Sequence, residues 1–127
     1  MAVYFTKAGE AITTNRIKGS GTEPNYVAWG TGAGSASTAS TTLSTEDSAG
    51  SPAYARIAGT STQQTTTNTN DTYHVIGTIT SNGTKTITNA GLFDAITTGN
   101  LFVIGDGLSI ALVLNDSIQF TIKISFA

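Results

Sequence analysis

The feature that most constrains this chain is a strict alternation of apolar and polar residues near its end. From residue 117 to residue 126, apolar side chains occupy every even position and polar side chains every odd one. Successive side chains of a β-strand point to opposite faces, so this pattern predicts a strand with one buried face. A similar alternation runs from Leu108 to Leu114, and Asn115-Asp116 between the two runs tolerates turn dihedrals. We therefore predict a C-terminal β-hairpin.

Two other segments predict strands in the interior of the chain. Tyr26 to Trp29 is β-prone and is bounded by turn-forming residues, so we expect a short buried strand with Trp29 in the core. Tyr73 to Thr80 alternates again, and Asn82-Gly83 follows it. Asn-Gly is a strong hairpin signal because both positions of a type I′ turn need positive φ. We therefore predict a second hairpin, between Tyr73–Thr80 and residues 84 to 88.

The remaining segments carry weaker patterns. Residues 1 to 5 predict either a first strand or an arm that packs against another molecule, and Ala8 to Ile17 allows one or two helical turns. Residues 33 to 51 consist mostly of Ala, Gly, Ser and Thr, which predicts a long, mobile surface loop anchored by Leu43. A strand is expected from Tyr54 to Gly59, followed by an exposed or edge-like tract to Asp71.

The spacing of these elements predicts the fold class. Strands recur about every ten residues with turn signals between them, which is typical of an antiparallel β-sandwich or barrel. The 127 residues suffice for one modest core. We predict an all-β, single-domain fold over residues 1–127 with six to eight strands, an N-terminal arm over about residues 1–8 and, as an option, one short N-terminal helix.

The low charge of the chain narrows its partners. Only 11% of residues are charged, and six Lys and Arg scattered along the chain cannot form a dense phosphate-neutralising patch. No apolar run approaches the ~20 residues that a membrane span needs. The N-terminus lacks the pattern of an export signal, and the chain has no cysteine. We expect a soluble protein with neither a nucleic-acid nor a membrane partner.

Motifs that could carry chemistry are weak. Gly30 to Gly34 resembles a phosphate loop, but Ser35 stands where a third glycine is needed, which favours a flexible loop. The single histidine, His74, lies within an alternating strand, so we interpret it as structural. Asn68 to Asp71 and Gly105-Asp106-Gly107 could lend oxygens to a cation, although neither has calcium-loop spacing. We predict no enzyme, no cofactor and no resident metal.

Aromatic side chains leave two interpretations open. They could form a platform for sugar binding or pack in the core, and core packing is favoured because large aromatic side chains are mostly buried. The candidates are Tyr26, Trp29, Tyr54 and Tyr73.

Several segments, in a fixed order, resemble a family of small virion proteins of tailed bacteriophages. These are NRIKGSG from Asn15, YVAWGTG from Tyr26, TTLSTE from Thr41 with the later Arg56, AGLFDAITTGNLF from Ala90, and NDSIQFTIKISF from Asn115. The resemblance implies an all-β structural protein without catalysis, with a helix at residues 8–17. It also implies that the acid of the TTLSTE segment lies near a following arginine. Here ten positions separate Glu46 from Arg56, so the spacing leaves that ion pair open.

Such proteins serve as capsid decoration (cement) proteins or as parts of tail fibres. Fibres usually carry shaft repeats or heptads, and this chain has neither, so we favour a decoration protein on the outer surface of the capsid, made in the bacterial cytoplasm. Its expected partners are the major capsid protein and two further copies in a homotrimer. The predicted partner-binding residues are Val3, Tyr4, Phe5, Arg16 and Lys18. The alternative is a tail-fibre or receptor- or glycan-binding tip protein, and a small hydrolase is a distant third.

Overall fold

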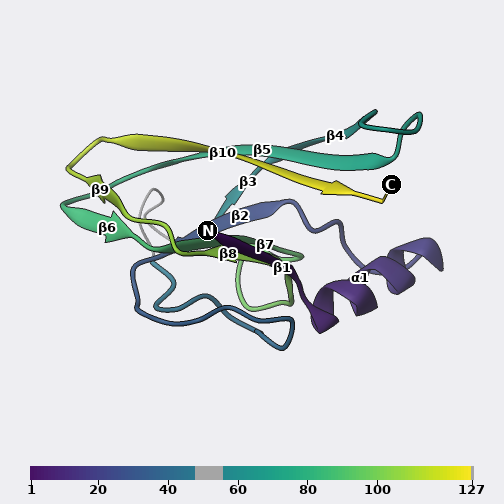
Figure 1. Ribbon diagram of the computed structural model, residues 1–127, viewed down its shortest axis with the longest axis horizontal. Coiled ribbons are helices and arrows are strands. Elements are labelled where there is room, and N and C mark those ends of the chain that lie inside the picture. The colour runs from purple at the N-terminus through teal and green to yellow at the C-terminus, as the bar shows by residue number, and fades with distance from the viewer. Residues whose placement is uncertain (48–55, 127) are drawn as a thin grey trace.

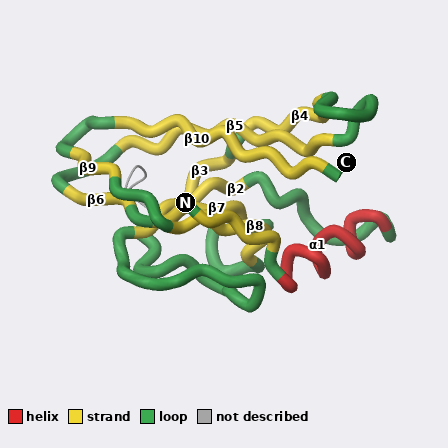
Figure 2. Tube along the Cα trace, viewed as in Figure 1, coloured by secondary structure: helices red, strands yellow, loops and turns green. Residues whose placement is uncertain are grey.

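The computed structural model describes residues 1–47 and 56–126 (Figures 1 and 2), and their structure is mostly β with one helix. The elements in chain order are β1 (Ala2–Phe5), α1 (Lys7–Ile17), β2 (Tyr26–Gly30), β3 (Arg56–Ala58), β4 (Thr60–Gln64), β5 (Thr72–Thr80), β6 (Lys85–Ile87), β7 (Asn89–Phe93), β8 (Leu101–Asp106), β9 (Ile110–Leu112) and β10 (Ser117–Ser125). All the strand pairs of these sheets are antiparallel, which confirms the predicted fold class.

The strands form two layers joined at one end. A five-stranded sheet has the order β1-β8-β7-β2-β3, and a three-stranded sheet, β10-β5-β4, lies across it (Figure 1). The β6-β9 pair lies at one end of the molecule and α1 at the other (Figure 2). The main core between the layers contains Trp29, Val75, Ile79 and Leu92, all fully buried. Because β1 and β10 are both edge strands, each sheet ends in an unpaired backbone edge.

Both predicted hairpins are wrong in their pairing. β10 pairs along its whole length with β5, from Ser117 opposite Thr80 to Ser125 opposite Thr72, and β9 pairs with β6. The two predicted turns are instead the corners of one long, bent ribbon. They are bonded to each other, because Ser81 N–H donates to the Asp116 carbonyl at 2.7 Å. Turn residues bend the chain locally, but burial across the layers decides which strand becomes the partner.

The left-handed backbone that a type I′ turn requires is missing from the Asn82-Gly83 corner. Neither residue has positive φ, whereas Asn115 at the other corner does, at 70°. Strand β10 itself confirms the expected strand, since its apolar positions face inward and its polar ones outward.

The N-terminal helix is longer than the one or two turns expected. Thr6 caps it by accepting a hydrogen bond from Gly9 N–H at 2.9 Å, while its hydroxyl donates to the Leu101 carbonyl at 2.6 Å. A Cβ at Gly9 would lie 2.3 Å from the Phe102 carbonyl oxygen, so glycine permits this close approach of the helix to β8. Tertiary packing thus extends a helix whose threonines have low intrinsic propensity.

Several shorter predictions are confirmed. Trp29 is fully buried in β2, and Leu43 anchors the long loop with 5% of its surface exposed. β4 is an exposed edge strand in the Thr/Gln tract. Of the two alternatives predicted for residues 1 to 5, the structure shows the strand, because β1 pairs with β8. Residues 54 and 55 of the strand expected to end at Gly59, and residues 48–51 of the predicted mobile loop, lie outside the described residues.

Candidate functional site

An apolar groove runs between the two edge strands β1 and β10. Its volume is about 400 Å³, and its floor is formed by β7 and β8. The side chains that line it are mainly aliphatic or aromatic, among them Met1, Val3, Val103, Leu108, Ile110, Ile118, Phe120 and Ile122. The inward residues of β10 are only half-buried, and Val3 is 59% exposed. The two layers are therefore open to solvent on this side.

The edges that flank this groove have little of the protection that natural sheet edges carry. Proteins usually block such edges with charged side chains, prolines or bulges, because an unpaired strand can accept a strand from another molecule. β1 has no charged side chain and β10 has one, Lys123. The nine residues of β10 are paired on the β5 side only. This side of the molecule is therefore suited to strand addition.

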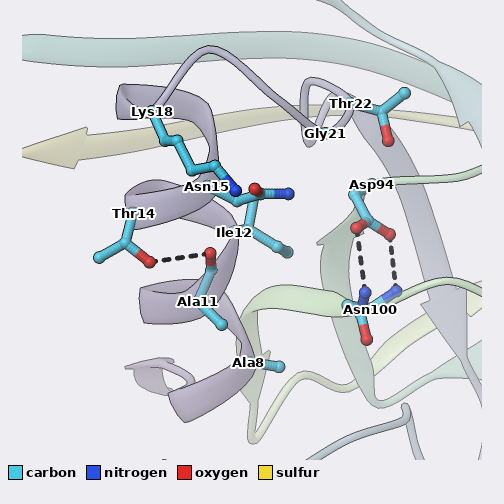
Figure 3. Close-up of a pocket in the computed structure, with 10 residues that line it drawn as sticks. All are labelled: Ala8, Ala11, Ile12, Thr14, Asn15, Lys18, Gly21, Thr22, Asp94 and Asn100. Atoms are coloured by element: carbon cyan, nitrogen blue, oxygen red, sulfur yellow. Dashed lines mark hydrogen bonds between the residues drawn. The ribbon is translucent and has the colours of Figure 1, made fainter.

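A second, polar groove lies between α1 and the loop that connects β7 to β8 (Figure 3). Its volume is about 650 Å³. The helix contributes small apolar side chains and Asn15, the turn after the helix contributes Thr22, and the loop contributes Asp94 and Asn100. Asn100 N–H donates to Asp94 Oδ1 at 2.6 Å, and Asn100 Nδ2 donates to Asp94 Oδ2 at 3.1 Å. These two bonds fix the orientation of the Asp94 carboxylate.

The buried Arg56 fixes the β7–β8 loop, which forms one wall of the polar groove. It is 6% exposed, and its guanidinium bonds Glu46 through both carboxylate oxygens, at 2.9 and 3.1 Å. Its Nη1 also donates to the carbonyls of Ala95 and Thr98 in the β7–β8 loop. The ion pair that the spacing left open is therefore formed, and it ties the long loop before β3 to the loop that carries Asp94.

A comparison with protein-family models assigns the chain to a group of known proteins. The model described as "Podophage GP4 fiber I protein gp80" matches residues 4–124. The chain belongs to this phage fibre family. Searches of curated proteins and of solved structures returned no match.

Membership of the fibre family corrects the predicted role. The capsid-decoration prediction is wrong, and the chain is a virion structural protein of the fibre, as the alternative stated. The prediction failed because it took the absence of heptads and shaft repeats as evidence against a fibre, whereas a fibre can include a compact β-subunit without them. The same membership confirms that the protein is structural rather than an enzyme.

The five predicted partner-binding residues do not form one surface in this fibre-family protein. Val3 lines the apolar groove and Lys18 lines the polar one. Tyr4 and Phe5 are half-buried, and the Phe5 ring packs edge-on against Phe102 with centroids 5.0 Å apart. Arg16 is exposed, and its Nη1 donates to the Gly21 carbonyl at 2.9 Å. A binding role for these residues stays a prediction.

Apart from Val3 and Lys18, sequence reasoning missed the residues that line the two grooves. The inward face of β10 was interpreted as scaffold, yet its half-exposed residues form one wall of the apolar groove. Asn15, Asp94 and Asn100 had no separate signal, because residues nearly eighty positions apart come together only in the fold. All three residues lie within the segments that carry the family resemblance, but nothing in those segments indicated that they share one surface.

Three titratable residues outside the two grooves, His74, Asp71 and Tyr73, have structural partners. His74 is 6% exposed, and its Nδ1 lies 3.1 Å from Thr62 Oγ1 and 3.0 Å from Gln64 Nε2. The backbone N–H of Asn68, with those of its two preceding neighbours, bonds the Asp71 carboxylate and holds the Asp71 pKa well below its usual range. Burial, together with Glu23, raises the pKa of Tyr73. The Asp71 carboxylate therefore stabilises the loop formed by residues 66–71.

The aromatic candidates and the glycine-rich segment that the sequence singled out also have structural roles where the structure describes them. Trp29 is fully buried, and the Tyr73 hydroxyl donates to Glu23 Oε1 at 3.0 Å, while Tyr54 lies outside the described residues. Gly32 N–H donates to the Ser44 carbonyl at 3.0 Å, and no helix follows this glycine-rich segment within the described residues. Within residues 1–47 and 56–126, no three His, Cys, Asp or Glu side chains cluster as metal ligands would. In the same ranges, no helix is long and apolar enough to span a membrane.

Proposed function

We propose that this chain is a structural fibre subunit that joins further copies of itself through the open side between β1 and β10. The observation that carries the proposal is the apolar groove between two unpaired sheet edges. An exposed apolar groove of this kind in a globular domain is typical of an interaction site. The fibre family supports assembly as the function, since a fibre is built from associated chains.

The mismatch between the two sheets supports strand addition as the mode of association. Five strands lie in one layer and three in the other, so the smaller sheet does not cover the larger one on the β1 side. A strand from a second copy, paired to the free edge of β10, would widen the smaller sheet to four strands. It would satisfy the outward N–H and C=O groups of β10 and cover Met1 and Val3, which are 81% and 59% exposed.

The charge pattern favours a second copy as the occupant. Charged side chains that a contact removes from water cost affinity unless they are paired, so a surface buried between copies should carry few charges. β1 and β10 together carry one charged side chain, Lys123. We propose three copies in a closed ring, in which β10 of one copy meets β1 of the next, so that neither of these two edges remains free. Three is the copy number of the homotrimer predicted from the sequence.

The test is the mass of the full chain in solution, measured by size-exclusion chromatography with light scattering. The unaltered chain should elute as a homotrimer. Val3→Glu places a carboxylate in the open groove and should shift the chain to monomer with an unchanged circular dichroism spectrum. The matched control is Ile17→Glu, since Ile17 is an apolar residue that is 82% exposed on α1, outside this groove. It should remain trimeric.

The possible failures separate the parts of the proposal. A monomeric unaltered chain at every concentration would refute self-association. A Val3→Glu variant that keeps the oligomeric mass would show that association uses another surface. An assembly of two or four copies would refute the ring of three while leaving the groove as the contact.

A further inference from the structure

We propose that the polar groove between α1 and the β7–β8 loop binds a neutral saccharide. This site shares no lining residue with the apolar groove, so the inference is independent of the proposed mode of assembly. Its volume of about 650 Å³ is within the range of small-ligand sites and leaves room for one or two sugar rings.

The walls of the groove present hydrogen-bonding groups that the protein itself does not use. Within the described residues, the side chains of Asn15, Lys18 and Thr22 make no hydrogen bond, and all three border the same opening (Figure 3). The Asn15 amide extends from α1 toward the Asp94–Asn100 pair on the opposite wall. Each Asp94 oxygen accepts one bond from Asn100 and retains a second lone pair. Donors and acceptors therefore face one another across the gap.

Besides Thr14 and Asn15, the helix presents only apolar side chains to the groove. Ala8, Ala11 and Ile12 line it, and the alanine methyl groups leave space where a longer side chain would fill the groove. A sugar ring has hydroxyls around its rim and C–H groups on its faces. Such a ring can rest its C–H face on these methyl groups while its hydroxyls reach Asn15 and Asp94. This combination of one apolar side and several convergent polar groups is typical of small-ligand sites.

The charges select against other ligand classes. Lys18 supplies one positive charge, but the Asp94 carboxylate faces the same space, so a phosphate or another anion would meet repulsion as well as attraction. A wholly apolar ligand would strip water from Asn15, Thr22 and Asp94 without replacing their hydrogen bonds, which is costly. A neutral ligand rich in hydroxyls can donate to Asp94 and accept from Lys18. That ligand is a saccharide.

The loop wall is held in place before any ligand arrives. Arg56 fixes the Ala95 and Thr98 carbonyls from the buried side. Gly99 has a φ of 70°, and a Cβ there would lie 2.5 Å from Asp94 Oδ1, so only glycine lets the loop fold back onto the carboxylate. A preformed wall lowers the entropy cost of binding.

The experiment is a titration of the ¹⁵N-labelled full chain, followed by two-dimensional NMR. The probes are neutral hexoses, N-acetylhexosamines and deoxyhexoses, each as monosaccharide and disaccharide. At least one probe should shift the amide signals of α1 and of residues 94–100 in a saturable way. Single sugars bind weakly, so a Kd on the order of millimolar is expected.

Two variants decide whether the shifts report this groove. Asn15→Ala removes an exposed amide that makes no side-chain hydrogen bond within the described residues, and it should weaken binding about tenfold, as expected for one lost hydrogen bond. The control is Asn82→Ala, an exposed asparagine in the turn between β5 and β6 whose Oδ1 accepts a hydrogen bond from Lys85 Nζ at 2.9 Å, and it should bind as the unaltered chain does.

Three results would overturn the inference. One is a panel in which no probe shifts these amides. Another is a set of shifts confined to residues outside the groove. The third is an Asn15→Ala variant with unchanged affinity. None of these results would alter the mass measurements that test assembly, so the two proposals fail separately.

Discussion

Replacing Arg56 with alanine should destabilise the fold more than any surface change, because one buried guanidinium holds together three segments. Its side chain is 7% exposed and that of its partner Glu46 is 22% exposed, so the ion pair is largely removed from water. The guanidinium also bonds two loop carbonyls and lies 3.5 Å from the centroid of the Phe93 ring. Removing one partner of a buried ion pair costs about 3–5 kcal/mol. We expect that loss for Arg56→Ala.

The assay is urea unfolding at neutral pH, followed by circular dichroism. With a slope of about 2 kcal/mol per molar urea, the midpoint should fall by about 2 M. Arg56→Lys keeps the charge but loses the fork geometry, so it should fall between the unaltered chain and Arg56→Ala. Adding Glu46→Gln to Arg56→Ala should cost less than the sum of the two single changes, because the two side chains interact directly.

A matched arginine gives the control. Arg16 is exposed and makes one side-chain hydrogen bond within the described residues, to the Gly21 carbonyl, so Arg16→Ala should change the unfolding free energy by less than about 0.5 kcal/mol. Equal midpoints for Arg16→Ala and Arg56→Ala would refute the reasoning. So would full stability of Arg56→Lys, because that result would assign the effect to charge alone.

Further changes test the core, the backbone and the pH dependence. Gly77→Ala would place a Cβ 2.7 Å from a valine methyl in β2 and should lower the unfolding free energy by about 1–3 kcal/mol, whereas Gly83→Ala, with open space around it, should leave the melting temperature nearly unchanged. Trp29 is fully buried and its Nε1 has no hydrogen-bond partner within the described residues. In urea titrations, Trp29→Phe should therefore cost less than Trp29→Ala, for which about 3–5 kcal/mol is expected. The pKa of Asp71 is lowered by the backbone N–H of Asn68 and its neighbours, so its stabilising effect is present above the ordinary value of 3.8 and is lost as the pH falls below it. Asp71→Asn should flatten the loss of stability measured at acid pH.

The sequence predicted strands well and strand partners poorly. Alternation from 117 to 126 specifies which side chains face inward, and β10 has that arrangement. It carries no information about the neighbouring strand, because any strand with a matching apolar face can pair with it. Short polar residues at 82–83 and 115–116 favour a bend, and a bend serves equally well as a hairpin turn or as the corner of a ribbon. Here both are corners.

For a related reason, local sequence patterns do not predict ion pairs between residues that are distant in the chain. Glu46 and Arg56 are ten positions apart with Pro52 between them, so local spacing gave no ground to expect contact. They meet because Glu46 bridges to Gly30 of β2, while Arg56 begins β3, which pairs with the same strand. The burial of Trp29 and Leu43 was easier to predict, since a large apolar residue within a polar or small-residue segment has few places other than the core.

The partial burial of β10 gives its alternation a second meaning. A strand with four apolar side chains on one face would be fully covered in a closed sandwich, but here the inward residues from Ile118 to Ile124 remain half-exposed. The same strand that pairs nine residues with β5 leaves an equally long edge unpaired. A monomer gains nothing from that edge and is exposed to aggregation by it. A subunit of a fibre gains a contact that is apolar, nearly uncharged and set in register by the backbone, so the feature that organises the fold is also the one best suited to assembly.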